Sequence, residues 1–173
     1  MGPAGAGKSE VAKHLRENYG FQTPHIKAPF ADMFRALLLH LGYSEEDATR
    51  FIDGDWKRKV VPELRITSTE AQQTLGTEWG RTCIRPSIWT DLWCLKADAI
   101  MSEGKSVALE SVRFIDEANA VSKRGGLLIE VRRPGTGAIN AHVSEAIPAP
   151  PDHILFNDGT IDQLRSRVDA LIR

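Results

Sequence analysis

Apolar residues recur at helical spacing over most of the first hundred residues. Residues 9–19 carry an apolar face and are followed by Gly20, which predicts a short helix. The stretch 30–41 has the strongest amphipathic pattern in the chain and predicts a second helix. A further helix is predicted over about 87–101, ending near Gly104. The N-terminal part of the chain is therefore expected to be mostly helical.

Two pairs of polar residues mark the starts of further helices. Ser44 is followed three residues later by Asp47, and Thr67 by Glu70. This is the spacing of a capping box, in which each side chain accepts a hydrogen bond from the backbone of the other. We expect a short helix after each pair.

The C-terminal part of the chain has a different pattern. Short apolar runs at 106–109, 127–131 and 153–156 predict buried parallel strands. A helix that ends at Gly125 separates the first two runs, and a final helix over 161–172 follows the third. Alternating strands and helices predict an α/β layer architecture.

Length and composition favour one intracellular domain. The chain has 173 residues, a formal net charge of −1 and two cysteines, so we expect a single domain over 1–173 without a disulfide framework. The balanced charge does not favour nucleic acid or an anionic membrane as a partner. No apolar run is long enough for a membrane span, and no signal sequence is recognised, so we expect a cytoplasmic protein.

A complete phosphate-binding motif opens the chain. Residues 2–9 fit the pattern G-x-x-x-x-G-K-[ST], which binds a nucleoside triphosphate. Its glycines let backbone amides surround one anion at the start of a helix. Lys8 is expected to reach the β- and γ-phosphates, and the Ser9 hydroxyl to bind Mg²⁺. The predicted ATP-binding residues of this segment are Gly2, Ala4, Gly5, Ala6, Gly7, Lys8, Ser9 and Glu10.

A motif of this kind normally follows a buried strand, whereas only Met1 precedes it here. Two explanations are open: a native segment is missing before Met1, or the fold does without this strand. We favour the first, and we expect the first strand to be absent from the chain.

A small-molecule kinase is the leading class, because the chain is short and has no guanine-reading Asn-Lys-x-Asp motif. Phosphoryl transfer needs cations around the transferred group. Arg113, Arg132 and Arg133 follow predicted strands, and strand carboxyl ends face ligands in open α/β sheets. Glu110, at the end of the run 106–109, is the acid best placed to hold Mg²⁺; capping the strand is the alternative role.

Several segments together resemble the deoxynucleoside monophosphate kinases of bacteriophages. The resemblance rests on the order of the segments 73–81, 111–118, 131–135, 142–145 and 157–160 after the phosphate loop. It implies a P-loop kinase fold: a three-layer sandwich with a mainly parallel sheet, a helical acceptor-binding insertion over about 28–102 and a lid over about 132–146. It also implies transfer of the γ-phosphate of ATP to a deoxynucleoside monophosphate with Mg²⁺.

The resemblance also implies roles for individual residues. Arg81 is the first choice for the acceptor phosphate, and Trp79 and Trp89 are flat surfaces for a base, although core packing is an equally good role for either. Arg132 and Arg133 become lid arginines. The acceptor residues implied are Lys27, Phe30, Gln73, Glu78, Trp79, Arg81 and Trp89, and those beside the adenine of ATP are Asn157, Asp158 and Gly159.

One position departs from the family pattern. Ser111 stands where such kinases usually have an aspartate, which leaves the arrangement around Mg²⁺ open. His142 and Glu145 lie in a family-like segment, with lid anchoring and chemistry as equal alternatives.

The sequence thus predicts a kinase that uses ATP and Mg²⁺ to phosphorylate deoxynucleoside monophosphates. A kinase for another small acceptor, such as dephospho-coenzyme A or a sugar acid, is one alternative. A nucleotide-binding module without transfer activity is the other. Base specificity stays open, as does the oligomeric state, for which a homodimer is one option.

Overall fold

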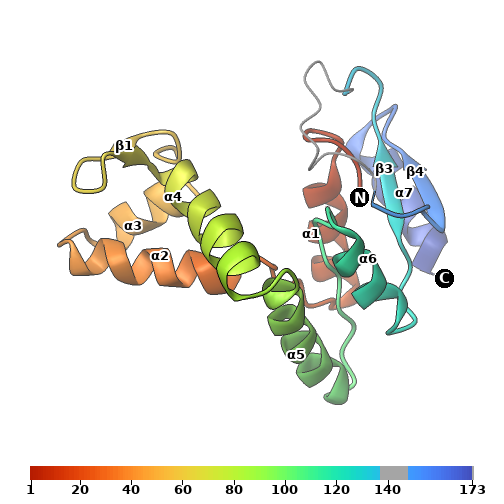
Figure 1. Ribbon diagram of the computed structural model, residues 1–173. Coiled ribbons are helices and arrows are strands. Elements are labelled where there is room, and N and C mark those ends of the chain that lie inside the picture. The colour runs from red at the N-terminus through yellow and green to blue at the C-terminus, as the bar shows by residue number, and fades with distance from the viewer. Residues whose placement is uncertain (137–147, 173) are drawn as a thin grey trace. The chain divides into compact units, whose positions relative to one another are not determined.

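The computed structural model describes residues 1–136 and 148–172 (Figure 1). The chain forms two compact units. Met1–His25 and Trp93–Arg173 make up unit 1, and Ile26–Leu92 make up unit 2, so the chain leaves the first unit once and returns to it.

Unit 1 carries the phosphate loop and a parallel pair of strands. Its elements are α1 (Lys8–Tyr19), the later part of α5 (Ile88–Ser102), α6 (Ile115–Ser122), β3 (Ile129–Arg132), β4 (His153–Phe156) and α7 (Ile161–Ile172). β3 and β4 pair in parallel, with Ile129 opposite His153 and Arg132 opposite Phe156. The parallel pairing confirms the predicted mixed α/β class, in which most of the regular structure is helical.

Helices pack on the two faces of this strand pair. Val131 of β3 belongs to a buried cluster with Val11 of α1 and Leu164 of α7. Leu128, next to β3, packs instead with Ala118 of α6 and with Met1. Because neighbouring strand residues point to opposite faces, the two clusters lie on opposite sides of the strands.

The predicted strand at 106–109 is not a strand in the structure. Val107 forms one isolated parallel bridge with Gln22, and the residues beside it carry no regular structure. A strand needs a partner along its length, and the apolar run by itself does not provide one. The predictions for 127–131 and 153–156 correspond to β3 and β4.

Unit 2 is built mainly from helices. It contains α2 (Ala28–His40), α3 (Glu45–Ile52), β1 (Val60–Val61), β2 (Ile66–Thr67), α4 (Ser68–Thr74), the π-helix η1 (Leu75–Ile84) and the start of α5. Its core is a cluster of fully buried side chains that includes Phe34, Leu38, Ile52 and Val61. The antiparallel β1–β2 pair and the π-helix were not predicted from the sequence.

Both predicted caps of unit 2 are present. The Ser44 side chain accepts a hydrogen bond from the amide of Asp47 at the start of α3. Thr67 and Glu70 form the full reciprocal capping box at the start of α4. These interactions join residues three apart, so the sequence contains all the information that they need.

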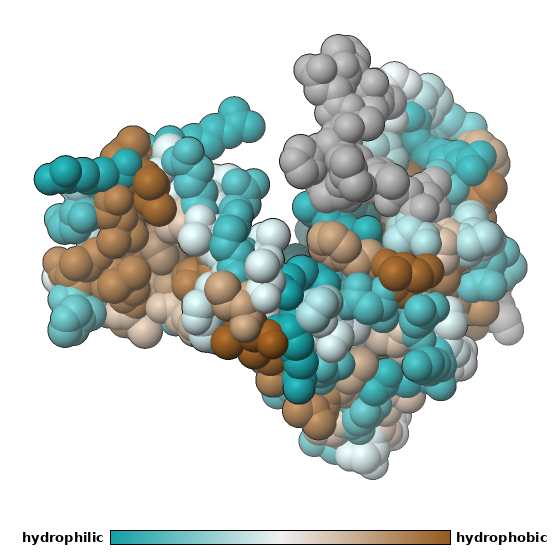
Figure 2. Space-filling model, in the orientation of Figure 1, coloured by the Kyte–Doolittle hydropathy of each residue, from teal (hydrophilic) through white to brown (hydrophobic). Residues whose placement is uncertain are grey.

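Apolar side chains also reach the surface of unit 2, where Figure 2 shows brown patches. Met33 and Leu37 lie one helical turn apart on α2, and each is 39% exposed.

No helix within residues 1–136 and 148–172 is long and apolar enough to cross a membrane.

Candidate active site

The glycines of the phosphate loop adopt backbone angles that other residues rarely take. Gly2, Gly5 and Gly7 have φ values of 121°, 75° and 106°. A Cβ atom on Gly2 would lie 2.4 Å from the carbonyl oxygen of Val131 in β3, so the loop also needs a glycine there for close packing. The local sequence and the neighbouring strand thus hold the loop in its curled form.

The loop leaves the N-terminus of α1 open. Gly7 is the N-cap of α1 and provides no side-chain hydrogen bond to the first turn. Within the part of the chain that the structure describes, the amides of Gly5, Gly7 and Ser9 donate no hydrogen bond to a protein acceptor. Such amides, together with the dipole of the helix, favour a bound anion.

The Lys8 side chain lies over the same loop. Its Nζ donates to the carbonyl oxygens of Gly2 at 2.8 Å and Pro3 at 2.6 Å. Folding back in this way keeps the ammonium group at the loop, where it can contact a phosphate. Lys8 follows directly from the motif, and the role expected of it at the β- and γ-phosphates stays a prediction.

Ser9 and Glu110 come together from distant parts of the chain. The Ser9 hydroxyl donates a hydrogen bond to Oε1 of Glu110, across 101 positions of sequence. A hydroxyl and a carboxylate are hard oxygen ligands, which suit Mg²⁺, and Mg²⁺ usually completes its shell with water and substrate phosphate. The two residues therefore fit a magnesium ion bound with a nucleotide. Among the described residues, no three His, Cys, Asp or Glu side chains gather into a metal site.

The Asn157–Gly159 turn lies against the phosphate loop. The Asn157 side-chain amide donates to the carbonyl oxygen of Ala6 at 2.9 Å. A Cβ on Gly7 would come within 2.6 Å of the same amide nitrogen, so the contact requires glycine in the loop. Asp158 pairs with Arg167 at 2.7 Å, and this hydrogen bond lowers the pKa of the Asp158 carboxyl.

Glu10 holds α1 against α7 in this structure. Its Oε1 accepts hydrogen bonds from Nε of Arg165 at 3.0 Å and from Nη2 at 2.5 Å. The carboxylate is therefore engaged in packing two helices together. Arg165 was not identified from the sequence, because one arginine on a predicted amphipathic helix gives no signal for a contact 155 positions away.

The three arginines predicted near the transferred phosphate lie in different surroundings. Arg133 is close to the loop, with Nη1 3.4 Å from the carbonyl oxygen of Gly5. Arg132 forms two hydrogen bonds of 2.8 Å with Glu130, and these bonds raise the pKa of its guanidinium. Arg113 donates from Nε to the Ser111 hydroxyl at 3.2 Å. Of the three, Arg133 is the one that the structure places beside the phosphate loop.

A buried glutamate that was not predicted holds the backbone at Arg113 by a hydrogen bond. Glu117 is 2% exposed, and its Oε2 accepts from the backbone amides of Arg113 at 2.6 Å and Phe114 at 3.3 Å. It stands at the third position of α6 (Ile115–Ser122), where a glutamate often reaches back to the residues before the helix. The position of Glu117 at the start of the helix is the sequence signal that could have identified this contact.

Part of the predicted lid lies outside the described residues. This applies to 137–146, which includes His142 and Glu145. At the start of the lid stretch, the Thr136 hydroxyl donates to the carbonyl oxygen of Arg133 at 2.7 Å.

The aromatic residues predicted for the acceptor cluster in unit 2. Phe30 and Trp89 meet edge to face with ring centroids 5.0 Å apart, and Trp79 lies 6.1 Å from Trp89. Trp89 is 3% exposed and donates to the Gly76 carbonyl at 2.7 Å, so its ring belongs to the core. Trp79 is 41% exposed and has surface available for a ligand.

The polar residues predicted for the acceptor lie in the same unit. Lys27 forms an ion pair with Asp53, and Arg81 donates to the carbonyl of Pro86 at 2.7 Å. Gln73 and Glu78 are exposed on α4 and η1. The Lys27 and Arg81 side chains are thus held in defined positions within unit 2.

Comparison with known proteins identifies the relatives of this chain. A profile of the deoxynucleotide monophosphate kinase family matches residues 64–168. A protein of Acanthamoeba polyphaga mimivirus, provisionally named a deoxynucleotide monophosphate kinase, is 28% identical over 99% of this chain and 93% of its own length. The deoxynucleotide monophosphate kinase of Escherichia phage RB69 is 28% identical over 58% of this chain and 43% of its own length.

These matches agree with the resemblance drawn from the short motifs, and they decide among the function classes that the sequence left open. They favour the deoxynucleotide kinase over a kinase for another acceptor or a module without transfer activity. The profile covers more than half of the chain, so this protein belongs to the deoxynucleotide monophosphate kinase family.

Proposed function

We propose that the chain transfers the γ-phosphate of ATP to the phosphate of a deoxynucleoside monophosphate, with the aid of Mg²⁺. The observation that carries the proposal is the glycine loop that opens into α1 with Lys8 and Ser9 in the first helical turn. The family supplies the class of acceptor. The products are ADP and a deoxynucleoside diphosphate.

The donor would bind at the loop through its phosphates. The open amides of Gly5, Gly7 and Ser9 can donate to phosphate oxygens, and Lys8 can turn its ammonium group from the loop carbonyls to the β- and γ-phosphates. The Asn157–Gly159 turn, attached to the loop through Ala6, would border the adenosine part of ATP.

Ser9 and Glu110 would hold the magnesium ion, Ser9 directly and Glu110 directly or through water. Bound there, Mg²⁺ would neutralise charge on the donor phosphates. The Ser9–Glu110 contact supports this assignment, and Ser111 is less suited to it because its hydroxyl accepts a hydrogen bond from Arg113.

The transfer itself needs positioning and positive charge more than a base. An oxygen of the acceptor phosphate attacks the γ-phosphorus, the bond to the bridging oxygen breaks, and ADP leaves with the electron pair. The attacking oxygen is already anionic, so no proton has to be removed. Lys8 and Arg133 are the cations that we assign to the moving phosphoryl group, with Arg113 next, because Arg132 is held by Glu130.

The acceptor would bind to unit 2. Trp79 presents an exposed indole ring on which a base can stack, and Arg81, two residues further along η1, carries the charge to hold the acceptor phosphate. The Gln73 amide can donate to or accept from the base edge, and the Glu78 carboxylate can accept from it. Trp89 packs beside the Trp79 ring from the core, and Phe30 packs against Trp89.

The remaining parts of the proposal concern the partners, the assembly and the location of the protein. We assign no nucleic acid or membrane partner, and a homodimer stays one option for the assembly. The relatives come from viruses, which favours the host cytoplasm as the place of action.

The direct test is ADP formation from ATP and Mg²⁺ with each of dAMP, dGMP, dCMP and dTMP, with the ribonucleotides alongside. We expect turnover with at least one deoxynucleotide and less with its ribonucleotide. A folded chain that binds ATP and phosphorylates none of them would contradict the proposal.

Two lysine variants of α1 make the test specific. Lys8→Ala should reduce kcat by a factor of about 100 or more, the usual cost of losing one charge-stabilising donor, with little change in the unfolding midpoint. Lys13→Ala is the matched control, because Lys13 is exposed on the same helix. Equal activity of the two folded variants would argue against the assigned role of Lys8.

A further inference from the structure

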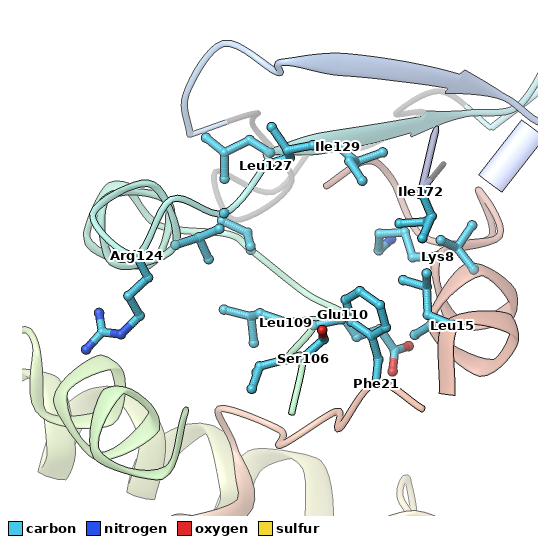
Figure 3. A pocket seen from close by; sticks show the side chains of 18 of the residues that line it. Lys8, Leu15, Phe21, Ser106, Leu109, Glu110, Arg124, Leu127, Ile129 and Ile172 are labelled. Atoms are coloured by element: carbon cyan, nitrogen blue, oxygen red, sulfur yellow. The ribbon is translucent and has the colours of Figure 1, made fainter. Parts of the chain in front are cut away.

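A short segment joins the candidate magnesium ligand Glu110 to the start of α6. Figure 3 shows Glu110 near Leu15 of α1, and its Oε1 accepts the hydrogen bond from Ser9 of the same helix. Arg113 follows three residues later, so its Cα lies within about 11 Å of the Cα of Glu110. Arg113 is exposed. Its side chain therefore starts close to the place where we expect the metal ion and the terminal phosphate of the donor.

The positive charge of the Arg113 guanidinium is not neutralised by an acid. Its Nε donates to the Ser111 hydroxyl at 3.2 Å, and no carboxylate pairs with it among the residues that the structure describes. The guanidinium of Arg132, by contrast, is paired with Glu130. A hydroxyl can orient a guanidinium without neutralising it, whereas a carboxylate forms a charge-assisted pair that competes with a phosphate. Arg113 is thus oriented and still able to bind an anion.

Buried contacts fix the backbone around Arg113. Val112 is buried and packs with Ala118 of α6. The buried carboxylate of Glu117 accepts hydrogen bonds from the amides of Arg113 and Phe114. A buried polar group that loses its partners is unfavourable, so these bonds hold the segment in one conformation. The exposed arginine side chain therefore extends from a fixed point of the backbone.

We propose that Ser111 and Glu117 are positioning residues that hold Arg113 in place to contact the terminal phosphate of the bound donor. Ser111 orients the guanidinium, and Glu117 fixes the backbone from which it extends. This role depends on the proposed function, which places Arg113 among the cations around the transferred phosphoryl group. It also explains the serine at position 111, where the family pattern has an aspartate, because a carboxylate there would bind the guanidinium.

The test compares the affinities of the 173-residue chain for ATP and for ADP, each with Mg²⁺, by isothermal titration calorimetry. The two nucleotides differ in the terminal phosphate, so the ratio of Kd for ADP to Kd for ATP reports contacts to that phosphate. Arg113→Ala should lower this ratio at least about tenfold, the usual effect of losing a hydrogen bond between charged groups. Ser111→Ala should lower it about threefold, because the guanidinium is kept but is no longer oriented.

A double variant separates positioning from a general loss of structure. In the Arg113→Ala chain, adding Ser111→Ala should change the ratio by less than a factor of about 1.5, because the residue through which Ser111 acts is gone. Ser122→Ala is the matched control, since Ser122 is an exposed serine at the end of α6, and we expect the parent ratio. The assigned roles are wrong if Ser111→Ala acts equally with and without Arg113, or if Arg113→Ala weakens ATP and ADP equally.

Two variants of Glu117 test the role of its hydrogen bonds. Glu117→Gln keeps an acceptor for the two amides, so we expect it to retain about half of the parent ratio or more. Glu117→Ala should lower the ratio as far as Arg113→Ala does. Circular dichroism shows whether this variant is folded, and if it is not, the serine variants carry the test. A folded Glu117→Ala chain with the parent ratio would contradict the role of Glu117.

Ser111→Asp tests why this position carries a serine. The new carboxylate should pair with Arg113, so we expect the ratio to fall at least as far as in Ser111→Ala. A ratio above that of the parent chain would assign position 111 to the metal ion and overturn the role of the serine.

These affinities depend neither on the acceptor nor on turnover. The expected ratios in a chain that phosphorylates no deoxynucleoside monophosphate would support the roles of Ser111 and Glu117 and contradict the proposed function. Turnover of a deoxynucleotide with the parent ratio in every variant would do the reverse. A folded chain that binds neither ATP nor ADP would overturn both.

Discussion

Blocking the amino group of Met1 should change how the stability of this chain depends on pH. The amino group is buried, since Met1 is 6% exposed, and it donates to the carbonyl of Ile129. Burial, followed by the nearby charge of Lys8, lowers the pKa of this amino group from 8.0 to about 6, while Glu130 acts in the opposite direction. A charged ammonium is thus less favourable here than in the unfolded chain.

The size of the effect follows from the two pKa values. One pKa unit corresponds to about 1.4 kcal/mol, so a fall from 8.0 to about 6 corresponds to about 3 kcal/mol. Between these values the unfolded chain binds more protons, so the free energy of unfolding rises with pH. The destabilisation caused by burying the charged amino group is fully present below pH 6 and absent above pH 8.

The assay is urea unfolding of the free and the N-acetylated chain at about pH 5.5, 7 and 8.5, values that bracket the two pKa values. Acetylation removes the charge and keeps an N–H that can donate to the carbonyl of Ile129. The other ionisable groups are the same in both forms, so their contribution cancels in the difference. We compare the free energy of unfolding of the acetylated chain with that of the free chain. We expect the acetylated chain's advantage to be about 3 kcal/mol larger at the lowest pH than at the highest. The same pH slope in both chains would refute the reasoning.

Two further predictions concern buried contacts. Glu117→Ala removes the acceptor of two backbone amides and should lower the free energy of unfolding by about 3 kcal/mol. Glu117→Gln keeps an acceptor and should cost less than half of that. Urea unfolding measures both variants, and equal losses would argue against the hydrogen bonds. Gly80→Ala puts a Cβ 2.2 Å from Trp89 and should cost about 3 kcal/mol. Gly76→Ala is its control, because the nearest atom there is 3.4 Å away; similar tryptophan-monitored unfolding midpoints for these two variants would contradict the prediction.

Local signals in the sequence predicted the helices well. The caps at Ser44 and Thr67 and the amphipathic pattern of α2 depend on residues within one or two helical turns. The π-helix η1 has no such local signal, and its close contact with Trp89, whose indole lies 2.2 Å from where a Cβ on Gly80 would be, joins residues outside one helical turn. The apolar run at 106–109 predicted a strand, but Gln22 is the one residue that pairs with it among those that the structure describes.

The phosphate loop is the part of the candidate site that the sequence determined by itself. The spacing of Gly2, Gly7, Lys8 and Ser9 specifies a loop and a helix start within a few residues. No long-range contact is needed to identify that chemistry, because backbone amides, an ammonium and a hydroxyl follow one another along the chain.

Only the tertiary structure decided which distant residues meet this loop. Glu110 lies beside Ser9 across 101 positions, and Asn157 lies beside Ala6 across 151. Arg133 also meets the loop only through the fold, with its Nη1 3.4 Å from the carbonyl oxygen of Gly5. The physical reason is that a sequence pattern records which face of an element is apolar, whereas the pairing and packing of elements decide which polar side chains share one place.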